Sequence, residues 1–285
     1  MFGKPKKTKR IFRRIVLLFI LGLTALLAWS MLFGRLVPFV PWTFAYGKSE
    51  TDKAMVYYRR EASTAAFARI DALVAETETF HHLSFEKKPE IFVCESDAAY
   101  RRITGTNARF VTMPFRGRIY VSPRAESDYL EKRIQFKTYI KHELSHALLY
   151  QHMSIIHTLF YPAWFMEGMA MVSAEQVGAD GYLTYEKVRE TLREGYFVEP
   201  NDWGTILTSK GESVRSCPLA HKFWFIYAEF ALIIRDMMTR HGQEKVLQFM
   251  KNSLSGDPFD VQFQRHFGTS IEEVFATYRR GGRTS

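Results

Sequence analysis

Residues 142–146 read His-Glu-Leu-Ser-His, which is an H-E-x-x-H pattern. On a helix, His142 and His146 lie one turn apart on the same face, so both imidazoles can reach one metal ion. Glu143 would lie beside them, where its carboxylate can contact a metal-bound water. Segment 129–151 contains no proline or glycine and carries apolar residues at helical spacing, so we expect one helix there. We interpret the pattern as a zinc site rather than a chance match on an amphipathic helix.

A zinc site that performs hydrolysis needs a third protein ligand and one open position for water. Glu167 follows His146 by 21 residues and lies in a second expected helix, over 163–177. Pro162 suits the start of that helix. The neighbours of Glu167 are mostly aromatic residues and methionines, and an acid in such surroundings usually has a partner. A metal ion shared with the two histidines would be that partner.

Two segments together resemble the gluzincin metallopeptidases, the peptidase-MA-like clan that includes thermolysin. They are the H-E-x-x-H pattern at 142–146 and Trp-Phe-Met-Glu-Gly-Met-Ala at 164–170. The resemblance covers residues 90–280 and is specific at these two segments and loose elsewhere. It implies a zincin-like fold, with His142, His146 and Glu167 as Zn²⁺ ligands and Glu143 as the catalytic base. The implied substrate is a peptide or protein.

The resemblance implies two further parts of a peptidase site. The strand Arg118–Val121 resembles the family's edge strand, which pairs with an extended substrate backbone. A later helix in the family supplies a Tyr or His that stabilises the oxyanion. Tyr227 is the closest match and His221 the alternative, although Tyr227 could equally be a core residue of its aromatic-rich helix.

One position departs from the family's pattern. Met171 stands where a second acid is expected, about one helical turn after Glu167. Glu175, one turn further, could orient a ligand histidine instead. His152 and His157 are close in sequence but off the ligand face, and we interpret them as structural or solvent-exposed.

Residues 15–33 carry no charge, and a helix of that length is about 28 Å long, close to the hydrocarbon thickness of a bilayer. Seven Lys and Arg residues precede this segment and only Arg35 closely follows it. The asymmetry predicts a single-pass anchor with its N-terminus in the cytoplasm and the rest of the chain on the extracytoplasmic side. A cleaved signal peptide is the alternative, but Ala28-Trp29-Ser30 is a poor cleavage site.

The net charge of +9 belongs mainly to the N-terminal stub. Subtracting the seven positive charges of residues 1–14 leaves about +2 for the remainder. No basic cluster stands out there, which argues against nucleic-acid binding. Cys94 and Cys217 could form one disulfide or remain two thiols, and they are too far apart in sequence for a thiolate zinc site.

The remaining patterns indicate a small sheet followed by a mostly helical half, which is an α+β fold. An extended connection is expected over 34–50. Helices are expected over 52–83, 98–103, 129–151, 163–177, 184–194, 218–240, 243–253 and 270–279, and strands over 91–94, 110–113 and 118–121. We divide the chain into a basic stub (1–14), an anchor (15–33), a linker and helical segment (34–89), a peptidase-like domain (90–280) and a tail (281–285).

The sequence thus predicts a membrane-anchored, zinc-dependent peptidase. One alternative is a catalytically idle zinc-binding scaffold or assembly protein on a peptidase fold. The intact Glu143 argues against it, since a purely structural zinc site does not need that residue. A protease with its site inside the membrane would need several spans, and the sequence contains one.

Overall fold

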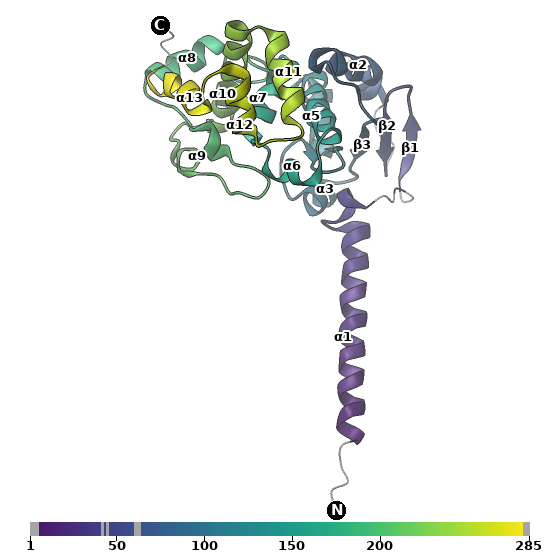
Figure 1. Cartoon of the computed structure of the whole chain (residues 1–285). Coiled ribbons are helices and arrows are strands. Elements are labelled where there is room, and N and C mark those ends of the chain that lie inside the picture. Colours follow the sequence, from purple (N-terminus) through teal and green to yellow (C-terminus); the bar gives the residue numbers. More distant parts are fainter. Residues whose placement is uncertain (1–5, 41–42, 44–45, 60–63, 282–285) are drawn as a thin grey trace, which may run out of the picture.

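The computed structural model describes residues 6–40, 43, 46–59 and 64–281 (Figure 1). A five-stranded mixed sheet lies in the N-terminal half, and helices dominate the C-terminal half, so the predicted α+β class is confirmed. The strands are β1 (Gly47–Glu50), β2 (Met55–Tyr58), β3 (Glu90–Val93), β4 (Phe110–Met113) and β5 (Arg118–Val121). Their order is β1-β2-β3-β5-β4. The three central strands are parallel, and the two outer strands pair antiparallel.

Alternate residues of the central strands point to opposite faces of the sheet, and each face is covered. Ile91, Ile119 and Val121 pack against α2 (Ile70–His81) and α5 (Phe136–Gln151). Phe92 and Tyr120 pack on the other side against α3 (Asp97–Thr104) and η1 (Val37–Phe39). The sheet therefore supports α5, the helix that carries the H-E-x-x-H pattern, from one side.

The helical half is built around the pair α7 (Ala163–Ser173) and α10 (Lys222–His241). Gly168 makes their close approach possible, because a Cβ there would lie 2.7 Å from Ile234 and 2.8 Å from the Phe230 carbonyl oxygen. The described part of the chain also contains these elements: η2 (Thr64–Phe67), α4 (Pro123–Leu130), α6 (Ile155–Phe160), α8 (Tyr185–Arg193), η3 (Pro200–Trp203), α9 (Glu212–Ser216), α11 (Gln243–Ser253), α12 (Phe259–Phe267) and α13 (Ile271–Arg279).

Most expected elements are confirmed within a few residues, but the helix expected over 52–83 is wrong in its first part. Met55–Tyr58 is β2, and α2 begins only at Ile70. Residues 60–63 of that segment lie outside the described part. The apolar run Met-Val-Tyr-Tyr is rich in β-branched and aromatic side chains and completes the sheet by pairing with β3. Strand β1, which was expected to be part of an extended connection, pairs with β2 and forms the outer edge of the sheet.

The single helix expected over 129–151 is also wrong, because α4 ends at Leu130 and α5 begins at Phe136. Lys132 between them has a left-handed backbone (φ +58°). The buried carboxylate of Asp128 is bound by Arg109 at 2.5 Å and by Arg133 at 3.0 Å. These contacts stabilise the chain reversal between α4 and α5. No local sequence pattern predicts that reversal.

Two other expectations need correction. Strand β5 is not an edge strand, because it lies between β3 and β4, and β4 forms that edge of the sheet. The helix expected over 163–177 ends at Ser173, and Glu175 beyond it is exposed with a left-handed backbone. Cys94 and Cys217 are both free thiols in the structure.

Helix α1 (Lys6–Phe33) projects from the domain (Figure 1), and its part Ile11–Phe33 is long and apolar enough to cross a membrane. A signal sequence has the same character. The residues after α1 are bound to the sheet by Arg118, whose side chain is fully buried. Its Nη1 donates to the carbonyl oxygens of Val37 at 3.2 Å and Val40 at 2.5 Å, and its Nε donates to Glu90 at 2.7 Å. The start of the domain is thus fastened where α1 ends.

Candidate metal centre

Helices α5 and α7 bring His142, His146 and Glu167 together. The Nε2 atoms of both histidines lie 3.2 Å from Glu167 Oε2 and 3.1 Å from each other. The two histidines are one turn apart on α5, and Glu167 faces them from α7. These three residues form a group that could hold a metal ion.

The chemistry of this cluster is compatible with a bound metal ion. If both Nε2 atoms carried protons for Glu167, the two N–H groups would oppose each other across 3.1 Å. Three donor atoms at these separations are close to the edges of a zinc tetrahedron, about 3.4 Å for bonds of about 2.1 Å. Two imidazoles and a carboxylate form a ligand set that zinc uses in hydrolytic sites.

The electrostatics of the group are strongly coupled. Burial opposes ionisation of Glu167, but the adjacent His146 and His142 outweigh it and hold the pKa of Glu167 well below its usual range. Burial likewise disfavours the charged form of His146, yet Glu167 raises the pKa of His146. The carboxylate is therefore ionised, as a metal ligand must be.

Glu143 is held by the edge strand β4. The Thr112 hydroxyl lies 2.7 Å from Glu143 Oε2 and 3.0 Å from the Glu143 backbone oxygen. The carboxylate is mostly buried at the wall of a cavity that His142 also lines. Sequence reasoning did not find Thr112, because a threonine in a strand gives no signal beyond strand propensity.

A cavity of about 430 Å³ opens beside His142 and Glu143. Seven of its twelve lining residues are aromatic, so a side chain bound there would be in apolar surroundings. The lining residues are Ala108, Arg109, Phe110, Tyr139, His142, Glu143, Gln176, Tyr182, Trp203, Phe223, Trp224 and Tyr227.

Of the two oxyanion candidates, Tyr227 lies next to Glu167 and lines the cavity, whereas His221 lies outside it. The Tyr227 hydroxyl lies 3.3 Å from Glu167 Oε1, and its ring centroid lies 6.2 Å from that of His142. Burial, and then the charge of Glu167, raise the pKa of Tyr227, so its hydroxyl remains a donor. His221 is exposed, stacks on Trp224 at 4.5 Å and does not line the cavity.

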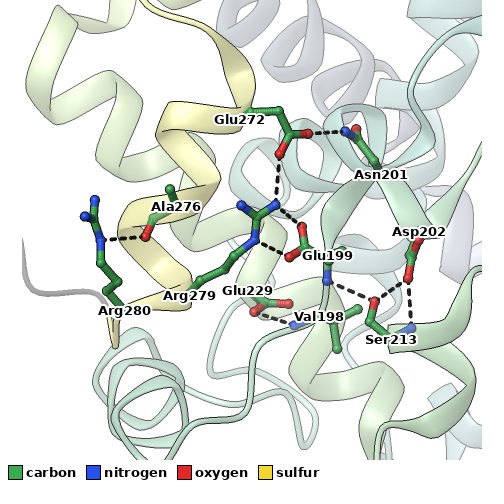
Figure 2. A network of polar contacts seen from close by, with 10 residues as sticks. All are labelled: Val198, Glu199, Asn201, Asp202, Ser213, Glu229, Glu272, Ala276, Arg279 and Arg280. Atoms are coloured by element: carbon green, nitrogen blue, oxygen red, sulfur yellow. Dashed lines mark hydrogen bonds and ion pairs between the residues drawn. The ribbon is translucent and has the colours of Figure 1, made fainter.

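Helix α13 contacts the segment that precedes Trp203, and Figure 2 shows these polar contacts at Glu199 and Asn201. Trp203 packs edge-on against Tyr227, with ring centroids 5.3 Å apart. Arg279 of α13 binds Glu199, just before Trp203, and also lies 2.9 Å from Glu272. This network keeps η3 in place next to the cavity.

A second polar contact lies beneath the ligand helix. Ser145, between the two ligand histidines, lies with its hydroxyl 2.8 Å from His81 Nε2 on α2. Both side chains are fully buried, and His81 Nδ1 lies 3.4 Å from the Met250 sulfur. Burial, together with the positive charges of His146 and Lys141, lowers the pKa of His81 to about 3. Neutral His81 thus connects α2, α5 and α11.

Other expected residues lie away from the centre. The Nδ1 atoms of His142 and His146 are buried and have no hydrogen-bond partner in the described part of the chain, so exposed Glu175 does not orient them. His152 contacts the Ser84 carbonyl oxygen at 2.9 Å, and His157 that of Gly256 at 3.1 Å. Both are half-buried and lie outside the group formed by His142, His146 and Glu167.

A comparison of this chain with protein-family models and with curated proteins finds no match. The function must therefore be argued from the geometry of the site itself.

Proposed function

We propose that this protein is a membrane-anchored, zinc-dependent peptidase with a zincin-like fold. The observation that carries the proposal is the convergence of His142 Nε2, His146 Nε2 and Glu167 Oε2, with Glu143 beside them on a cavity wall. A purely structural zinc site would want a fourth protein ligand. The group formed by the described residues has three.

The chemistry assigns each residue a separate role. A zinc ion held there would act as a Lewis acid on the scissile carbonyl and lower the pKa of water. Glu143 accepts the proton of the attacking water and later delivers it to the leaving amine. Thr112 holds one oxygen of Glu143, leaving the other available for this proton. The Tyr227 hydroxyl donates to the oxyanion as it forms.

The substrate would approach along β4. This strand is at the edge of the sheet, and its Thr112 contacts the motif helix. An extended peptide can pair with the free edge of such a strand. The aromatic cavity favours a large apolar side chain next to the cleaved bond.

For the location of the protein, we propose that α1 spans the membrane with its basic N-terminus in the cytoplasm. The domain then lies on the extracytoplasmic side, whether periplasmic or extracellular. The charge asymmetry around α1 supports this orientation.

Comparing the full-length protein with Glu143→Gln in detergent tests the proposal. Both are incubated with an unfolded protein substrate, and the zinc content of each is measured. Cleavage by the wild type alone, with equal zinc in both, is the expected result. Cleavage by both proteins would show that Glu143 is not the catalytic base. Bound zinc without cleavage by either would favour the scaffold alternative.

A further inference from the structure

The most exposed large apolar side chains of the folded domain lie on one short helix. Outside α1, the highest exposed fractions among the described large hydrophobic residues are those of Ile156 (69%), Ile155 (67%) and Phe160 (63%), all on α6. Ile206 and Leu207, in the loop before α9, are exposed as well. Single exposed apolar residues are ordinary, but three on a six-residue helix indicate a contact surface.

This surface lies at the end of the domain that faces the anchor. In Figure 1, α3 and α6 lie just above the end of α1, at the lower side of the domain. The helices α2, α8 and α11 lie at the opposite, upper side. Helix α6, which carries the three most exposed apolar residues, therefore lies on the side of the domain where a membrane crossed by α1 would be.

The end of α1 is bound to the domain, so the position of α6 relative to α1 does not depend on a flexible linker. Arg102 of α3 donates from Nε to the carbonyl oxygen of Phe33, the last residue of α1, at 2.6 Å. Arg118 holds the carbonyl oxygens of Val37 and Val40 directly afterwards. The α6 surface thus stays on the α1 side of the domain.

Charge at this end also fits a lipid surface. Arg101 and Arg102 are exposed in the last turn of α3. Arginines beside apolar residues suit the boundary between phosphate headgroups and acyl chains. Helix α6 itself carries no acidic residue that would be repelled there.

We infer that α6 is a second membrane contact, seated in the headgroup layer of the bilayer that α1 spans. Ile155, Ile156 and Phe160 enter the upper acyl region, and Arg101 and Arg102 face phosphates. The inference rests on the proposed anchoring by α1 but not on peptidase activity. With two contacts, the domain is held at a fixed orientation to the membrane.

Depth-dependent fluorescence quenching of the full-length protein in lipid vesicles tests this contact. Cys217→Ser leaves only the buried Cys94 as a native thiol, so one added cysteine can be labelled with an environment-sensitive fluorophore. Three variants are compared: Ile156→Cys on α6, Leu23→Cys within α1, and Val261→Cys on α12. Val261 is 47% exposed and serves as the matched control. Two sets of vesicles of zwitterionic and anionic phospholipid are used, one containing lipids with a nitroxide near the headgroup, to reach position 156, and one containing lipids with a nitroxide in the middle of the acyl chain, to reach position 23.

We expect the label at position 156 to shift to shorter wavelength and to lose emission in the presence of the nitroxide lipid, while the label at 261 does neither. A quenched label at 23 with an unquenched one at 156 would overturn the α6 contact alone. A blue-shifted but unquenched label at 156 would also overturn it, because a protein surface would then cover α6. An unquenched label at position 23 would contradict both the proposed membrane span of α1 and the α6 contact that rests on it. This conclusion would not depend on the result of the peptidase assay.

Discussion

The hydroxyl of Thr112, on the edge strand β4, lies 2.7 Å from the Glu143 carboxylate on helix α5. The strand proposed to receive the substrate is therefore directly coupled to the proposed general base. A substrate that pairs with β4 would bind next to the residue that fixes the direction of Glu143. We therefore propose Thr112 as a positioning residue for the proposed base.

Replacing Thr112 with valine should lower kcat about 10-fold, within the range for the loss of an outer partner, with unchanged zinc content. Valine keeps the branched shape but removes the donor to Glu143. Thr112→Ser keeps the donor and should restore most of the rate. Steady-state kinetics and zinc analysis of the three proteins provide the measurement. Equal kcat for the valine variant and the wild type would show that Thr112 does not position the base.

Removing the Tyr227 hydroxyl should lower kcat about 100-fold, as the loss of an oxyanion donor does, with little change in KM. Tyr227→Phe keeps the ring that packs against Trp203, so the cavity wall should stay intact. The control is His221→Ala, because that side chain stacks outside the cavity. If the histidine variant lost the rate and the phenylalanine variant did not, the assignment would be reversed.

Glu167→Gln should weaken zinc binding by at least about 100-fold, since losing a ligand costs more than losing an outer partner. The amide lacks the charge that balances the ion beside His142 and His146. Glu175→Gln is the matched control, because Glu175 is exposed beyond the end of α7. Competition with a chelator of known affinity gives both dissociation constants. Similar values for the two variants would argue against Glu167 as a ligand.

Acid should destabilise the domain through His81. Its pKa is about 3 in the folded state against 6.5 as the ordinary value, so below pH 6.5 the unfolded chain takes up a proton that the folded chain does not. The free energy of unfolding then falls as the pH decreases from 6.5 toward 3, by up to about 2 kcal/mol at pH 5.

His81→Asn should remove this part of the pH dependence. Urea unfolding of both proteins at pH 7, 6 and 5, in the presence of a chelator, isolates the contribution, since the two proteins differ only at position 81. The stability of the wild type should fall more steeply than that of the variant. Parallel curves would mean that His81 is protonated in the folded state or remains neutral in both states.

The convergence of His142, His146 and Glu167 could be predicted from helical spacing and from the surroundings of Glu167. The turn between His142 and His146 follows from the helix, and Glu167 stands out as an acid among apolar residues. Strand order could not be predicted, because β4 folds back beyond β5 and takes the edge position. The break near Lys132 depends on a contact between Asp128 and the distant Arg109. Thr112 becomes informative only when β4 is seen against α5.

The position of Arg279 in the chain determines how early during synthesis the cavity wall around Trp203 can form. Arg279 binds Glu199 next to the wall that contains Trp203, yet it follows Glu167 by 279 − 167 = 112 residues in the chain. Since a chain emerges from the ribosome from its N-terminus, the motif helix and the ligand glutamate are made well before this contact is possible. We expect the wall around Trp203 to be completed only after residue 279 has left the ribosome. A nascent chain would then hold His142, His146 and Glu167 before the cavity beside them has its final shape.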